Sequence, residues 1–384
     1  MRIQLFFIAF FLFPVLHLSA QSSNEPQCVS TETEQWNREN QAAFQQFKNS
    51  LNYPAWRMNT TPIIVPVVFH VVNNDIYVSQ VATDAALLAM INRLNIYFAK
   101  QNADTSTIPV AFQLLAAASS ISFCLAATDP VGNSTTGIVR VPSSHGPFYP
   151  TQDNELTSTA LGGDDPWPYI QYVNIYICAL DPGHLGFASH GHAAVSYIAL
   201  SGTTLTHEMG HVFGLSHTWG FTPYTCSDDD GIADTPKEYG STTGTPTYPL
   251  YDACTTTGDG IMYMNLMDYA QQRTMFTIEQ VALMEYTLTT NSDYIAMTST
   301  NNCQTVGVES VFSSSIPLYP NPAHENFTIN ITGELKIYDM TGRLVKEQTV
   351  NGKQETVNCK LNAGIYCVKV TAGTKQFTQK LVIE

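Results

Sequence analysis

The chain has 384 residues with 32 acidic and 17 basic side chains, so its formal net charge is −15. An acidic chain without a basic stripe cannot neutralise phosphates, so we exclude nucleic acid as a partner. The length predicts two or three domains, and the acidity suits a secreted protein that binds calcium.

The N-terminus has the pattern of a secretory signal peptide. Residues 1–20 read MRIQLFFIAFFLFPVLHLSA, with one arginine, an apolar core and small residues before a cleavage point after Ala20. Pro14 and His17 interrupt the apolar run, and no later stretch approaches transmembrane length, so we expect no membrane span in the mature chain. Residues 21–58 are polar, charged and helical in character, and we interpret them as a pro-segment.

The next segments predict an α/β domain. The β-branched run 62–72 predicts a buried strand, and residues 81–102 carry apolar side chains at helical spacing. Two further strands are predicted at 121–130 and 172–180, before a helix rich in histidine. This order predicts a mixed twisted sheet backed by helices, an α/β (α+β) fold over residues 59–295.

The stretch THEMGHVFGLSHTWG predicts a metal site. His207 and His211 share one face of a helix, with Glu208 beside them. Gly214 can take the left-handed conformation that ends a helix, and the turn would bring His217 back to the same point. Three neutral imidazoles with a fourth position open are the ligands of a catalytic Zn²⁺, whereas two histidines alone would be an ordinary core pair.

This site predicts a zinc endopeptidase that acts on protein or peptide substrates. Zinc lowers the pKa of a bound water, and Glu208 can accept that water's proton and pass it to the leaving amine. One alternative is a surface binding or adhesion protein with a structural zinc site, which would have a fourth protein ligand and no need of a base. Another is a zinc hydrolase for non-peptide amides. A second metal could be bound by His184, His190 and His192. The simpler interpretation is that these histidines line the active-site cleft or face solvent.

The remainder of the chain predicts a long loop, a linker and a second domain. Residues 221–260 are rich in Asp, Thr, Gly and Pro and have little periodicity. Residues 296–315 have the composition of a linker. Residues 316–384 contain short runs in which apolar and polar residues alternate, separated by turn sequences. This pattern predicts a small all-β sandwich.

These motifs together resemble the metzincin metalloproteases. HEMGHVFGLSH matches their extended zinc motif, and NLMDYA matches their methionine turn. The Met-Asp-Tyr form and the preceding DGIADTP are similar to the pappalysin family, over roughly residues 60–290. The resemblance implies that Met267 supports the imidazoles without binding the metal. It also implies that Tyr269 stabilises the tetrahedral intermediate, although a tyrosine that only packs the turn is the alternative.

The loop after the zinc motif offers ligands for a second cation. Asp230, Asp234 and Thr235 present hard oxygen atoms that fit Ca²⁺, and the family resemblance implies the same. The run of aspartates from Asp228 to Asp230 would equally suit a solvated acidic turn.

The cysteines leave several pairings open. A disulfide between Cys226 and Cys254 would bracket and restrain the loop. Cys28 matches a pro-segment cysteine of the family and can cap the zinc as a thiolate before processing, or form a disulfide. Cys124 and Cys178 lie in predicted strands and can equally be buried thiols.

The C-terminal domain resembles the sorting domain of the Bacteroidetes type IX secretion system. YPNPAHENFTI, KIYDMTGRLV and LNAGIYCVKV match its three customary stretches. The resemblance implies passage through the periplasm, recognition by the type IX secretion machinery, and a final place outside the cell or on its surface.

The residues after the methionine turn bear on specificity. Several pappalysin-like proteases use an acidic residue there to prefer a basic residue just after the scissile bond. This chain has Ala270, Gln271, Gln272 and Arg273 instead. We predict that strict cleavage before arginine or lysine is lost.

Overall fold

The computed structural model describes residues 31–50, 61–300, 302–303, 318–339, 343–352, 355–358, 360–372 and 375–383. The chain divides into two compact units, Met1–Gln304 and Thr305–Glu384. The predicted signal peptide and Cys28 lie outside the described residues. Every helix within the described ranges is too short or too polar to cross a bilayer.

The first unit contains the predicted mixed sheet. Its strands are β1 (Ile63–Asn73), β2 (Ile121–Leu125), β3 (Ile138–Pro142), β4 (Val173–Cys178), β5 (Gly186–Ser189) and β6 (His192–Ser196). The order is β2-β1-β4-β6-β5, and β3 pairs with the second half of β1. All pairs are parallel except β5 with β6. Because β1 and β4 are interior parallel strands, their side chains are buried almost without interruption.

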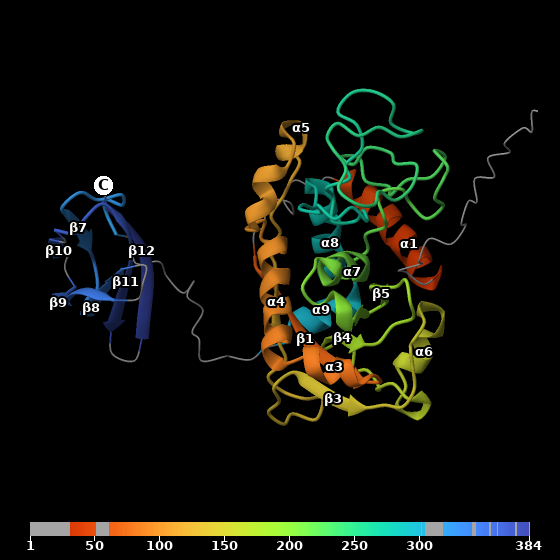
Figure 1. Ribbon diagram of the computed structural model, residues 1–384, viewed down its shortest axis with the longest axis horizontal. Helices are drawn as coiled ribbons and strands as arrows, with labels where there is room; N and C mark the ends of the chain where they lie inside the picture. Colours follow the sequence, from red (N-terminus) through yellow and green to blue (C-terminus); the bar gives the residue numbers. More distant parts are fainter. Residues whose placement is uncertain are drawn as a thin grey trace, which may run out of the picture. The chain divides into compact units, whose positions relative to one another are not determined.

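Helices surround this sheet. They are α1 (Thr31–Lys48), α3 (Ile76–Val81), α4 (Asp84–Phe98), α5 (Val110–Gln113), α6 (Asp153–Leu156), α7 (Thr204–Val212), α8 (Ile278–Thr290) and α9 (Ser292–Thr298). Figure 1 shows α7 near the centre of the unit, with α4 on one side and α1 on the other. Every residue of α7 is buried, because the helix packs on β5, β6 and α4. The zinc motif therefore lies in the interior of the unit.

The described part of the predicted pro-segment is helix α1, which packs against the turn after α7. The side-chain amide of Asn37 donates to the Leu215 carbonyl at 3.0 Å, and that of Gln41 donates to the Ser216 hydroxyl at 3.1 Å. Two ion pairs flank these contacts, Arg38–Asp228 at 2.7 Å and Lys48–Glu279 at 2.6 Å. Helix α1 thus supports the backbone that leads to His217.

Two disulfides tie long segments of the first unit. Cys226 and Cys254 are bonded and close part of the irregular segment after α7. Cys124 on β2 is bonded to Cys303, whereas Cys178 on β4 is a buried thiol. Since α9 ends at Thr298 and Cys303 is tied to β2, the first unit extends past the predicted boundary at residue 295.

The second unit is a small antiparallel all-β domain, as predicted. Its strands are β7 (Asn326–Ile329), β8 (Thr332–Asp339), β9 (Leu344–Asn351), β10 (Glu355–Asn358), β11 (Gly364–Ala372) and β12 (Lys375–Ile383). They form one four-stranded sheet, β12-β11-β8-β9, and one two-stranded sheet, β10-β7. Phe327, Leu335, Val350 and Val368 belong to a separate hydrophobic core within this unit.

Candidate active site

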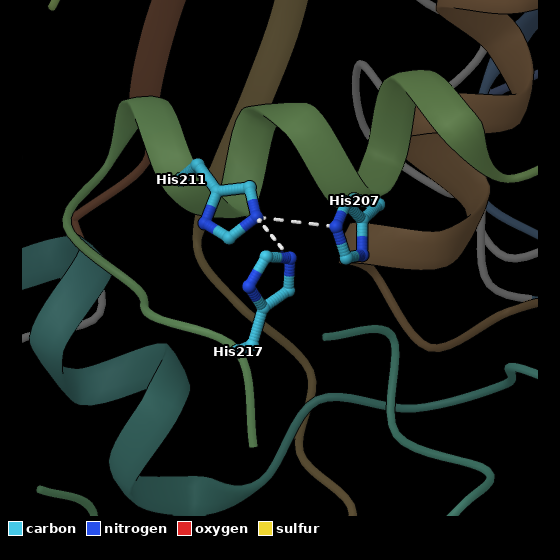
Figure 2. Close-up of side chains that lie close together, drawn as sticks. All are labelled: His207, His211 and His217. Atoms are coloured by element: carbon cyan, nitrogen blue, oxygen red, sulfur yellow. Dashed lines mark hydrogen bonds between the residues drawn. The ribbon is translucent and has the colours of Figure 1, made fainter. Parts of the chain in front are cut away.

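Helix α7 and the turn after it bring three histidines together. His207 and His211 lie one helical turn apart on α7. Gly214 follows the helix with φ of 99°, a left-handed conformation that a residue with a side chain rarely adopts. The chain then reverses, and Figure 2 shows the His217 ring facing the other two.

The hydrogen bonds of the rings define their protonation. The Nδ1 atoms of His207 and His211 donate to the carbonyls of Leu266 and Leu215, each at 2.7 Å. Their Nε2 atoms therefore carry lone pairs, and the Nε2 of His211 lies 3.1 Å from that of both His207 and His217. Burial lowers the pKa of all three imidazoles, that of His211 to about 4, so the rings are neutral near pH 7.

This arrangement fits a zinc ion. Tetrahedral zinc with Zn–N bonds of about 2.0–2.1 Å places its ligand nitrogens about 3.3 Å apart, close to the separations found here. Among the described residues, these three are the one group of His, Cys, Asp or Glu side chains whose ligand atoms converge in this way. They would hold the metal without adding negative charge, which preserves its Lewis acidity.

Glu208 lies beside the ligands with a buried carboxyl group. Its Oε2 has no hydrogen-bond partner within the described chain, although the side chain is almost fully buried. Burial raises the pKa of Glu208 well above its ordinary value, and the charge of Arg273 opposes that rise. The backbone of Gly186 on β5 passes so close that a Cβ there would lie 2.7 Å from Glu208 Oε1. The carboxyl is therefore held between α7 and β5.

The methionine turn lies beneath the histidines. Met267 is fully buried, and its sulfur occupies the space that a side chain at Gly210 of α7 would need. Asn265 and Gln280 exchange two amide hydrogen bonds, at 2.8 and 3.1 Å, and so fasten the turn to the start of α8. The turn presents the Leu266 carbonyl that orients His207.

Sequence reasoning missed several of these supports. Gly210 is a glycine inside a helix, which is a recognisable signal of close packing. Trp219 stacks on the His217 ring at 4.3 Å, and the Asn265–Gln280 pair spans the turn and α8. The tryptophan and the amide pair have no spacing signature, because their partners are fixed by the fold.

Tyr269 faces the metal ligands. Its hydroxyl lies 3.1 Å from His217 Nε2, and its ring packs edge-on against Trp219 at 5.0 Å. The phenol oxygen thus lies close to the point where the histidine nitrogens converge, and Tyr269 also lines the adjoining cavity.

The predicted calcium residues make two sets of hydrogen bonds. Asp230 is buried, and both its carboxylate oxygens accept the Thr235 hydroxyl, at 2.8 and 2.9 Å. The Asp234 carboxylate accepts the Thr277 hydroxyl at 2.6 Å and the Glu279 amide at 3.0 Å, at the N-terminus of α8. The carboxylate of Asp234 is thus held at the start of α8, and the calcium site of these three residues stays a prediction.

The other histidines each lie against a carboxylate. The shortest nitrogen–oxygen distances are His184–Asp181 at 2.7 Å, His192–Asp153 at 2.8 Å and His190–Asp293 at 4.0 Å. Within the described ranges they form no further cluster with three converging ligand atoms.

A cavity of about 200 Å³ adjoins the histidines. Its walls come from the segment before and at the start of β5, from α7 and from the residues after the methionine turn. The lining residues are Gly183, His184, Leu185, Gly186, Thr204, His207, Glu208, Tyr269 and Arg273. Glu208 and one metal ligand therefore open onto a space that can receive a substrate side chain.

Comparisons with known proteins agree with this geometry. Residues 186–289 match the family model described as pregnancy-associated plasma protein-A, and residues 317–384 match the secretion system C-terminal sorting domain. Mature mirolysin of Tannerella forsythia, solved with a cleaved peptide, is 35% identical over 62% of this chain and 96% of its own, with a TM-score of 0.59. A mutant of Tannerella forsythia promirolysin is 31% identical over 71% of this chain and 97% of its own, with a TM-score of 0.61.

No curated protein matches the chain. The family match nevertheless spans the zinc motif and the methionine turn, and the structural match extends to almost the whole of mirolysin. The chain therefore belongs to the pappalysin family of metzincin metalloendopeptidases and ends in a type IX secretion sorting domain that directs it out of the cell or to its surface.

Proposed function

We propose that this endopeptidase uses Glu208 for proton transfer and Tyr269 as a hydrogen-bond donor, at a zinc site held by His207, His211 and His217. The observation that carries the proposal is the buried Glu208 carboxyl next to three converging imidazole nitrogens. A purely structural zinc site would have no use for an unsatisfied buried carboxyl or for an adjoining cavity.

When bound, zinc supplies Lewis-acid activation of a water molecule and of the scissile carbonyl. Glu208 accepts the proton of the attacking water and hands it to the leaving nitrogen. The Tyr269 hydroxyl donates to the developing oxyanion, because it already points at the centre of the ligand set. The close approach of β5 to Glu208 keeps the carboxyl at the cavity wall.

The sheet offers a place for the substrate backbone. β5 is the last strand of the sheet and pairs with β6 alone among the described strands. It begins at Gly186, which lines the cavity. An extended peptide can add to this edge through main-chain hydrogen bonds, which would present its scissile bond to Glu208.

We also propose a calcium ion in the loop after the zinc motif. Asp230 is buried and has Thr235 and the Ile232 carbonyl beside it, since the Thr235 hydroxyl oxygen also lies 2.9 Å from that carbonyl oxygen. Burial raises the pKa of Asp230 well above its ordinary value, although the Thr235 hydroxyl lowers it. A bound cation would compensate this buried carboxylate with oxygen ligands of the type that calcium prefers.

We further propose that residues 21–58 are a pro-segment in which Cys28 caps the zinc before processing. We also propose that the type IX secretion machinery recognises the sorting domain. These proposals rest on the family and on the sorting domain, since Cys28 lies outside the described residues.

The test compares Glu208→Ala and Tyr269→Phe with the wild type on casein, with and without a chelator. Glu208→Ala should retain zinc by metal analysis and lose roughly 100- to 10,000-fold in turnover. Tyr269→Phe should lose roughly 100-fold. Glu155→Ala, which removes a carboxyl that pairs with His145, is the matched control. Near-wild-type turnover by zinc-loaded Glu208→Ala would remove Glu208 from the mechanism.

A further inference from the structure

One backbone carbonyl connects helix α1 to a metal ligand. The Leu215 carbonyl accepts Nδ1–H of His211 at 2.7 Å and the side-chain amide of Asn37 at 3.0 Å. Asn37 and Leu215 are both buried, although they lie 178 residues apart in the chain. The carbonyl that orients the His211 ring is therefore itself held by a side chain of the predicted pro-segment.

Asn37 serves this carbonyl as a hydrogen-bond donor. A carbonyl oxygen can only accept, so the NH2 group of Asn37 must face Leu215. The amide oxygen of Asn37 has no hydrogen-bond partner within the described residues, although the side chain is fully buried. A buried oxygen without a partner costs free energy, which an apolar side chain of similar size would avoid. The bond to Leu215 is thus what distinguishes asparagine from leucine at this position.

Helix α1 holds the whole turn that joins the second histidine to the third. Gln41 lies one helical turn after Asn37 on the same face of α1. Its amide donates to the Ser216 hydroxyl at 3.1 Å and to the Gly214 carbonyl at 3.4 Å. Each of the three consecutive residues Gly214, Leu215 and Ser216 therefore has an acceptor atom that binds a side-chain amide of α1.

We propose that Asn37 is a positioning residue for His211, and that α1 thereby strengthens zinc binding in the unprocessed chain. This inference rests on the zinc site of the proposed function. A hydrogen bond to a histidine ligand fixes the orientation of its ring, and loss of such a partner lowers metal affinity roughly 10- to 100-fold. Asn37 acts one bond further out, through the Leu215 carbonyl, so we expect an effect at the lower end of this range.

The experiment measures the zinc affinity of the full chain by competition with a chromophoric chelator. Every protein carries Glu208→Ala, which in the proposed mechanism prevents self-cleavage and keeps α1 attached. Asn37→Leu retains a side chain of similar volume but removes the donor, so zinc affinity should fall roughly 10-fold. Asn37→Ala removes the donor without adding bulk, and it should show the same loss if leucine disturbs the docking of α1.

Gln45→Leu is the matched control. Gln45 lies on the same face of α1, two helical turns after Asn37, and its amide donates to the Gly231 carbonyl at 3.0 Å. Its zinc affinity should equal that of the parent protein. Parental affinity in both Asn37 variants would overturn the proposal. An equal loss in Gln45→Leu would also overturn it, because the effect would then belong to the docking of the whole helix.

A second measurement needs no metal. In the metal-free chain, the NMR signal of the His211 Nδ1 proton reports its hydrogen bond to Leu215. Asn37→Leu should shift this signal, whereas Gln45→Leu should leave it in place. If the parent protein binds no zinc, the proposed function fails, but the proton signal still decides the role of Asn37. An unchanged signal in Asn37→Leu would reject that role.

Discussion

Glu34 is a single side chain whose ionisation bears on how α1 docks. It is 4% exposed, and its carboxylate accepts the Ser216 hydroxyl at 3.4 Å, one residue before the third histidine. Burial raises its pKa from 4.5 to about 7, although the charge of Arg38 and the Ser216 hydrogen bond lower it. The docked helix therefore favours the protonated carboxyl.

The stability of the folded protein should fall as the pH rises from about 4.5 to 7. Between about pH 4.5 and 7 the folded chain binds more protons at Glu34 than the unfolded chain, which costs up to about 3 kcal/mol of stability by pH 7. Glu34→Gln should flatten this slope and melt higher than the wild type at pH 8. Thermal unfolding from pH 5 to 8 measures both effects on the chain that retains α1.

Glu39→Gln is the control, because Glu39 is exposed on the same helix. A Glu34→Gln protein with the same pH slope as the wild type would show that this carboxyl does not titrate between the folded and unfolded states.

At the scale of elements, the irregular segment after α7 depends on restraints in place of secondary structure. The Cys226–Cys254 bond closes part of it, and in a chain-entropy model a loop of this size contributes roughly 3 kcal/mol. Glu238, also buried, accepts the Thr218 hydroxyl at 2.5 Å and the Met262 amide at 3.0 Å. These bonds connect the segment to the residue after His217 and to the chain that leads into the methionine turn.

Calcium removal should loosen this segment before zinc is lost. At calcium about 100-fold above its dissociation constant, binding adds about 2.7 kcal/mol, so chelation selective for calcium should lower the Tm by roughly 5–10 °C. In Asp230→Ala the Tm should no longer depend on calcium. Asp259→Ala, which changes an exposed aspartate of the same segment, should retain the full response. A wild-type melting curve that is identical with and without calcium rules out the site.

At the scale of the whole molecule, the two units have separate hydrophobic cores and their own sheets. This division suits a protein whose C-terminal part serves export and whose N-terminal part performs catalysis. The first unit closes on itself through the Cys124–Cys303 bond, so it retains its last segment when the chain is cut beyond it.

Processing should follow these divisions. We expect the mature enzyme to begin between about residue 40 and 60 and to lack or detach the residues beyond about 315. Residues 40–48 belong to the packed helix α1, and a protease needs an unfolded segment, so the N-terminal cut should fall after Lys48. Mass spectrometry of both termini of the secreted protein checks this. A mature N-terminus outside residues 40–60, or a detached C-terminal fragment that begins well before residue 315, would contradict the boundaries.

The zinc site was predictable from the sequence because its determinants are local. Helix geometry fixes the relation of His207 to His211, and Gly214 permits the reversal that returns His217, all within one short stretch. The sheet class followed from strand and helix periodicity, and the methionine turn and the sorting domain from family motifs.

Only the tertiary structure decided which distant groups meet. Cys124 and Cys303 are 179 residues apart, and no spacing rule selects that pair. The Asp234 carboxylate accepts the Glu279 amide at the start of α8, 45 residues along the chain, and Arg273 lines the same cavity as Glu208. Such contacts depend on how buried surfaces pack against one another. Because the whole core determines this packing, no local pattern in the sequence predicts them.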